Sequence, residues 1–164
     1  MNELLRNPDP ECLHPVFREK AAALLAALEA EGFAFRLFEG FRSPERQQRL
    51  YAQGRTLPGA IVTKARPWMS YHQYGLAGDF VIFAKGNWSW EAAGEKAGRW
   101  RRLHEIGRQL GLEPLSFELP HLQIAGLQIA DLAAGQYPDG GNASWRAAMD
   151  QAKESWRRSG PKAA

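Results

Sequence analysis

The chain has 164 residues, of which 45% are hydrophobic, and it carries a formal net charge of +3 with a sequence pI of about 9.2. This length suits one compact domain with a real core and is too short for two comfortable ones. A single cysteine, Cys12, excludes an internal disulfide, and no apolar run reaches the length of a membrane span.

The first elements along the chain are a helix and a strand. Apolar residues at helical spacing predict a helix over residues 15–31, and Gly32 is a natural place for it to end. His14, just before this helix, is more typical of a structural or solvated histidine than of a metal ligand. The aromatic-rich run over residues 33–38 alternates loosely and predicts a strand.

A second helix begins directly after this strand. Ser43 is a good N-cap and Pro44 suits the first helical position, so a helix is expected over residues 44–53. Arg42 therefore projects from the junction between strand and helix. A guanidinium there could bind a carboxylate or a developing oxyanion, or it could pair with a nearby glutamate at the surface. Residues 55–69, rich in proline, glycine and basic residues, predict a long loop at the rim of a site.

One stretch places an imidazole and a carboxylate close together along the chain. His72 and Asp79 are separated by Gly75 and Gly78, and the apolar run 80–83 that follows predicts a buried strand. We expect Asp79 at the mouth of that strand and His72 on the preceding loop, which the two glycines allow to bend. Imidazole and carboxylate are both ligands that zinc accepts.

The second half of the chain is mainly helical. Helices are predicted over residues 95–110, 127–134 and 143–158, the last two packing back on the domain. Residues 84–94 are expected to form a loop whose Trp88 and Trp90 pack at the rim of the core rather than stack on sugars. His104 borders an apolar stripe and is expected to be packed or exposed rather than a ligand.

A second polar motif lies in an extended segment. Glu118 and His121 are three residues apart with Pro120 between them, and proline disfavours a helix here. If the backbone turns near Pro120, both side chains can face one metal ion together with His72 and Asp79. Spacing alone is equally compatible with four ordinary turn residues.

The order of these motifs resembles a known family. Three blocks carry the resemblance: Gly40-Phe41-Arg42-Ser43-x-x-Arg46-Gln47 with Leu50-Tyr51-x-x-Gly54-Arg55, then Ser70-x-His72-x-x-Gly75-x-Ala77-x-Asp79, then Glu118-x-Pro120-His121. Together, over about residues 36–123, they are similar to the LAS-type (M15) zinc peptidases. That family includes D-Ala-D-Ala carboxypeptidases and dipeptidases and the endolysins that cut the L-alanyl-D-glutamate bond. The first block looks like the endolysin branch.

The resemblance implies an α+β fold in which a small antiparallel sheet carries one Zn2+ and is flanked by helices. It implies three zinc ligands: His72, Asp79 and His121. It also implies that Glu118 is the catalytic base, that Arg42 binds substrate or stabilises the oxyanion, and that Ser70 helps to hold the substrate or the site. Since three ligands leave zinc one open position, a basic role for Glu118 is also the chemically sensible one. Leu122 replaces the aromatic residue of many relatives, which predicts a different pocket wall.

The expected function is hydrolysis of an amide bond in peptidoglycan stem peptides by one catalytic domain, residues 1–164. The first block favours the L-Ala–D-Glu bond, and a D-alanyl-D-alanine carboxypeptidase or dipeptidase is the alternative. A non-catalytic zinc-binding module would need neither Glu118 nor Arg42, and a nucleic-acid or envelope-binding domain would gather its scattered basic residues on one face. We expect a monomer that binds no nucleic acid. No signal peptide is visible, so we expect synthesis in the cytoplasm and action on the wall after lysis or export.

Overall fold

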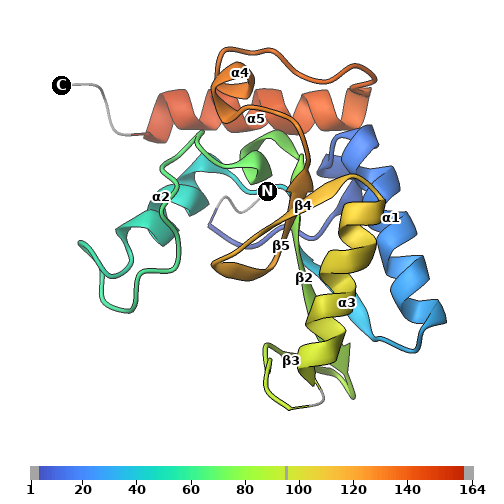
Figure 1. Cartoon of the computed structure of the whole chain (residues 1–164). Coiled ribbons are helices and arrows are strands. Elements are labelled where there is room, and N and C mark those ends of the chain that lie inside the picture. The colour runs from blue at the N-terminus through green and yellow to red at the C-terminus, as the bar shows by residue number, and fades with distance from the viewer. Residues whose placement is uncertain (1–3, 95, 161–164) are drawn as a thin grey trace.

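The computed structural model describes residues 4–94 and 96–160 (Figure 1). Its centre is an antiparallel sheet in which β1, β2, β5 and β4 lie side by side in that order and β3 pairs with β2. The strands are β1 (Phe35–Glu39), β2 (Ala77–Ala84), β3 (Asn87–Ser89), β4 (Leu112–Leu115) and β5 (Glu118–Ile124). The predicted α+β class, a small antiparallel sheet flanked by helices, is confirmed.

Five α-helices and two short 3-10 helices surround this sheet in the described ranges. The α-helices are α1 (Pro15–Ala30), α2 (Pro44–Ala52), α3 (Lys96–Gln109), α4 (Ile129–Ala133) and α5 (Ala143–Ser159). The 3-10 helices are η1 (Pro10–Cys12) and η2 (Tyr71–Tyr74). In Figure 1, α1 and α3 lie together on one side of the sheet, and α2 with the loop after it lies on the other. None of these helices is long and apolar enough to span a bilayer.

The buried core lies between the sheet and the helix pair α1 and α3. Phe17 and Leu24 of α1, Phe80 of β2, and Trp100 and Leu103 of α3 are each no more than 2% exposed. Burying large apolar side chains of this kind contributes about 1.5–3 kcal/mol each relative to leaving them in water. The helix pair therefore fixes one face of the sheet, and the polar residues of β2 and β5 can line the other.

The two glycines between His72 and Asp79 have different structural roles. Gly75 ends η2 with a left-handed φ of 66°, so it provides the predicted bend. Gly78 instead lies within β2, where an added Cβ would come 2.8 Å from Leu37 Cδ1 and 3.2 Å from Phe17. The expectation that Gly78 bends the loop is wrong, since it is needed for close packing. Asp79 likewise lies inside the strand rather than at its mouth.

The predicted loop over residues 84–94 contains a strand. Lys85 and Gly86, both with positive φ, make a tight turn after which β3 pairs back onto β2. Trp88 and Trp90 contact the Phe38 ring edge-on, with ring centres 5.0 and 5.1 Å away. This packing agrees with the structural role predicted for both tryptophans.

A register shift in β5 brings Glu118 and His121 to the same side. Pro114 of β4 pairs with Leu122, but the next residue, Leu115, pairs with Glu118, so residues 119–121 have no counterpart in that ladder. Such a bulge re-aims side chains that a regular strand would place on opposite faces. The predicted turn of the backbone near Pro120 therefore occurs as a bulge within a strand.

The C-terminal helices contact the elements around the site. The indole Nε1 of Trp145 in α5 donates a hydrogen bond of 2.8 Å to the carbonyl oxygen of Tyr74 at the end of η2. The hydroxyl of Tyr71 in η2 donates one of 2.5 Å to the carbonyl oxygen of Leu127, just before α4. Helix α5 and the segment before α4 thus hold η2, which supplies His72.

Candidate active site

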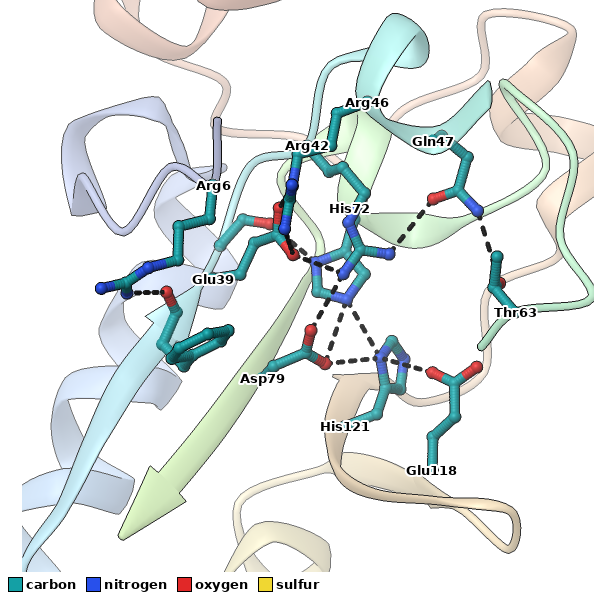
Figure 2. Close-up of polar contacts among 12 residues, drawn as sticks. Arg6, Glu39, Arg42, Arg46, Gln47, Thr63, His72, Asp79, Glu118 and His121 are labelled. Carbon is teal, nitrogen blue, oxygen red and sulfur yellow. Dashed lines mark hydrogen bonds and ion pairs between the residues drawn. The ribbon is translucent and has the colours of Figure 1, made fainter. Parts of the chain in front are cut away.

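Three side chains with metal-binding atoms converge on one point (Figure 2). His72 comes from η2, Asp79 from β2 and His121 from β5, and the last two are directly paired in the sheet. His72 Nε2 lies 3.1 Å from His121 Nδ1. Asp79 Oδ1 lies 3.3 Å from His72 Nε2 and 3.4 Å from His121 Nδ1. Strand pairing and the η2 turn therefore gather residues that are far apart in the sequence.

These distances match the ligand shell of one metal ion. A tetrahedral zinc ion with bonds of about 2.0–2.1 Å separates its ligand atoms by roughly 3.3 Å. The other ring nitrogen of each histidine already has a partner. His72 Nδ1 donates to the carbonyl oxygen of Gly40 at 2.7 Å, and His121 Nε2 donates to Gln123 Oε1 at 3.0 Å. These bonds leave the lone pairs of His72 Nε2 and His121 Nδ1 directed at the common point.

The local charges favour a cation at this point. Burial alone would raise the pKa of Asp79, but the imidazoles of His72 and His121 and the guanidinium of Arg42 hold that pKa well below its usual range. Burial and the charge of Arg42 lower the pKa of His72 despite the nearby carboxylate. An ionised carboxylate beside a neutral imidazole is the protonation state that metal binding requires.

Arg42 lies behind the cluster and contacts one of its members. Its Nη2 donates to Asp79 Oδ2 at 2.9 Å and to Glu39 Oε2 at 2.8 Å, and its Nη1 donates to Gln47 Oε1 at 3.1 Å. Glu39, only 2% exposed, also accepts a hydrogen bond from Arg46 Nε. Asp79, Arg42, Glu39 and Arg46 thus form a row of alternating charges from the cluster into the protein (Figure 2). Arg42 lines the pocket, as expected, but its guanidinium contacts carboxylates of the protein itself.

Three residues of this arrangement were not predicted from the sequence: Glu39, Gln47 and Gln123. Gln123 could have been found, because it lies two residues after His121 on a strand and therefore on the same side. Glu39 lies three residues before Arg42, but nothing local indicates that its carboxylate is buried. Gln47, buried on α2, stands in the first block of the family resemblance, but no role was predicted for it.

An open pocket of about 500 Å3 lies in front of the cluster. Its lining includes four of the predicted site residues: Arg42, Ser70, Glu118 and His121. The loop before η2 contributes residues 63–66 and Met69, while Leu115, Phe117 and Ile129 provide apolar surface. A carboxylate, a guanidinium and an imidazole therefore share the pocket with apolar walls suited to a peptide.

Glu118 lies beside the cluster without joining it. Its Oε2 is 3.8 Å from His121 Nδ1, and its side chain is 26% exposed to the pocket. A carboxylate at this distance, open to the pocket, is placed to exchange protons with a molecule bound next to the three converging atoms.

The remaining predictions concern residues around the site. Leu122 is fully buried, and a Cβ on Gly107 of α3 would come within 3.0 Å of it. The expectation that Leu122 shapes the pocket wall is wrong, because it faces the core on the opposite side of β5 from His121. His14 and His104 lie outside the cluster, as predicted: His14 Nδ1 accepts the amide of Val16, and the His104 ring contacts the Leu119 carbonyl oxygen.

Two imidazoles and a carboxylate converge beneath an open pocket with a second carboxylate beside them, an arrangement typical of metal-dependent hydrolases. The sequence model of the VanY family, described as D-alanyl-D-alanine carboxypeptidase, matches residues 10–131. The peptidoglycan L-alanyl-D-glutamate endopeptidase CwlK of Bacillus subtilis (strain 168) is 44% identical over 117 residues, which are 68% of this chain and 70% of CwlK. The chain belongs to the VanY family, which confirms the resemblance to LAS-type (M15) peptidases.

Two solved structures share the fold. The L,D-carboxypeptidase DacB from Streptococcus pneumoniae is 25% identical with a TM-score of 0.52, and the match covers 77% of this chain and 74% of DacB. The D,D-pentapeptidase VanY of a VanB-type vancomycin-resistance cassette, solved in complex with Zn(II), is 20% identical with a TM-score of 0.52 over 74% of this chain and 78% of its own. The family relationship makes this protein a peptidoglycan peptidase by class.

Proposed function

We propose that the protein is a zinc-dependent peptidase that hydrolyses the L-Ala–D-Glu bond of peptidoglycan stem peptides. The observation that carries this proposal is the convergence of His72 Nε2, Asp79 Oδ1 and His121 Nδ1 within 4.8 Å of one another beneath a pocket that also contains Glu118. The 44% identity to an L-alanyl-D-glutamate endopeptidase supports this choice of bond. We also propose that the protein acts as a monomer.

His72, Asp79 and His121 are the proposed ligands of a single zinc ion. Two imidazoles and one carboxylate suit zinc better than magnesium or calcium, which prefer shells made of oxygen atoms. Zinc held there supplies a Lewis acid that makes water more acidic and an amide carbonyl more electrophilic. Gly40 and Gln123 orient the two histidines through their second nitrogens, which keeps the ligand atoms in place before substrate arrives.

Glu118 is the proposed general base. Its carboxylate accepts a proton from the attacking water and returns it to the nitrogen of the leaving amine, so the broken amide yields a new carboxylate and a new amine. Arg42 keeps Asp79 ionised and adds positive charge at the edge of the pocket, where the carbonyl oxygen becomes negative. Ser70, on the pocket wall beside Arg42, is proposed to hold the peptide backbone.

The description of the family model supports an alternative bond, the terminal D-Ala–D-Ala amide. The pocket is open and accommodates either an internal or a terminal bond. A module that only binds zinc has no need for a carboxylate directed into the pocket beside the ligands, so Glu118 argues against it. Since peptidoglycan lies outside the cytoplasmic membrane, the proposed action follows lysis or export.

The test is mass spectrometry of purified muropeptides after incubation with zinc-loaded protein, chelated protein and a Glu118→Gln variant. Glu154→Gln, an exposed carboxylate change on α5, is the matched control. We expect fragments only with zinc and intact Glu118, carrying a new L-Ala carboxyl end and a new D-Glu amino end. Loss of one D-Ala would establish the alternative bond. If zinc binds stoichiometrically and neither bond is cut, the peptidase proposal is wrong.

A further inference from the structure

The pocket is lined by three cationic side chains, and among the described residues only Arg42 has its charge balanced by carboxylates. Arg42 contacts Asp79, Glu39 and Gln47. Arg66 Nε donates to the Tyr51 hydroxyl at 3.3 Å, and its guanidinium lies 5.7 Å from the centre of that ring. Lys64 is the third.

Of these three cations, Lys64 is the one whose donors make no hydrogen bond to the described residues. Among residues 4–94 and 96–160, no carboxylate lies within 4 Å of its ammonium and no hydrogen bond engages it; its contact is with the Phe117 ring, whose centre is 5.1 Å away. Phe117 is 59% exposed and immediately precedes Glu118 in the chain. The ammonium of Lys64 therefore lies over the Phe117 ring, in the lining of the same pocket as Glu118.

The backbone that carries Lys64 is fixed on both sides. Gln47 Nε2 donates to the carbonyl oxygen of Ala65 at 2.7 Å and to Thr63 Oγ1 at 3.4 Å, the second contact being visible in Figure 2. Both Nη atoms of Arg55 donate to the carbonyl oxygen of Thr63 at 3.2 Å. Gln47 also contacts Arg42, so it links the backbone around Lys64 to the cluster. The ammonium itself makes no hydrogen bond to the described residues and can bind a ligand in the pocket.

Both proposed substrates carry an anion at one particular position. In a stem peptide, D-Glu continues the chain through its side-chain carboxyl, so its α-carboxylate is free on the carbon that bears the scissile nitrogen. In a terminal D-Ala–D-Ala bond, the C-terminal carboxylate occupies that same position. This carboxylate must approach Glu118, whose charge repels it. The Nη donors of Arg42, which is proposed to act on the carbonyl oxygen, are directed at Asp79, Glu39 and Gln47 instead of at this carboxylate.

We propose that Lys64 binds the free carboxylate on the residue that follows the scissile bond. This role of Lys64 rests on the proposed function. It would make the enzyme prefer a leaving amine that carries a carboxylate on the adjacent carbon. The ammonium donates a charge-assisted hydrogen bond to the carboxylate, and Phe117 excludes water from one side of the pair.

The test compares each peptide with its amidated form. Two pairs of synthetic peptides are used: an L-Ala–γ-D-Glu stem peptide with its D-Glu α-carboxamide, and a D-Ala–D-Ala peptide with its C-terminal amide. The measured quantity is the ratio of kcat/KM for the carboxylate over that for the amide, in the wild type, Lys64→Met and Lys64→Arg. Lys153→Met is the matched control, because Lys153 also lies over a ring, that of Tyr137, at 5.4 Å on α5.

We expect the wild type to favour the carboxylate and Lys64→Met to lower the ratio by about tenfold to a hundredfold, the scale of a hydrogen bond to a charged group. Lys64→Arg should retain most of the preference, and Lys153→Met all of it. The peptide pair that shows the effect identifies which carboxylate is bound. An unchanged ratio in Lys64→Met overturns the inference, even if peptides are still cut. Failure of the wild type to cut any peptide overturns the proposed function instead.

Discussion

The row of charges behind the cluster makes Glu39 the most informative residue to change. Glu39 accepts hydrogen bonds from Arg42 and Arg46, and the side chains of Glu39 and Arg42 are only 3% and 8% exposed. Glu39→Gln keeps the size and one acceptor oxygen but leaves two guanidinium groups without their shared anion. Removing one partner of a buried ion pair costs about 3–5 kcal/mol, and the retained oxygen places this change near the lower end, at about 3 kcal/mol.

Two measurements on the purified variant follow from this geometry. Urea unfolding of the metal-free protein should show the loss of stability as a lower midpoint with an unchanged slope. Competition with a chelator should show weaker zinc binding by about tenfold to a hundredfold, because Arg42 loses the contact that fixes it against Asp79.

The control for Glu39→Gln is the same substitution at an exposed ion pair. Glu31, on the surface, accepts hydrogen bonds from Arg102 at 2.6 and 2.7 Å, so its geometry is comparable while its burial is not. Glu31→Gln should leave both the unfolding midpoint and zinc affinity almost unchanged. If Glu39→Gln behaves like Glu31→Gln in both assays, the row of charges supports neither the fold nor the site, and the reasoning is wrong.

Two further predictions concern residues around the cluster. Gln123→Ala removes the acceptor for His121 Nε2 and should weaken zinc binding by about tenfold to a hundredfold in a chelator competition, with little effect on unfolding; unchanged affinity would show that Gln123 does not orient His121. Burial, with a contribution from Tyr137, raises the pKa of Tyr74 to about 12. The neutral phenol is therefore favoured in the folded state, and its contribution is complete below the unfolded pKa of about 10 and is lost as pH rises to about 12, up to about 3 kcal/mol. Denaturant titrations from pH 9 to 12 should show a smaller loss of stability in Tyr74→Phe than in the wild type; parallel losses would contradict this assignment.

The sequence by itself determined the local structure and the residue types available to the site. Ser43 caps α2 by accepting the amide of Arg46 at 3.1 Å, and Gly75 adopts the left-handed conformation that ends η2. Such features depend on residues a few positions apart, so they can be recognised in a single sequence. The imidazoles and the carboxylate of His72, Asp79 and His121 are visible in the sequence as well, and the family resemblance singles them out as the zinc ligands proposed above.

Only the tertiary structure decided which of these groups meet and what lies behind them. Pairing of β2 with β5 sets Asp79 opposite His121, and the bulge in β5 turns Glu118 to the same side. The contact between Arg42 and Asp79 joins residues 37 positions apart. Strand register and packing at such separations depend on how whole elements fit together, so they cannot be predicted from local periodicity. For the same reason, local sequence wrongly predicts that Gly78 bends the loop and that Leu122 lines the pocket. Both residues face the core.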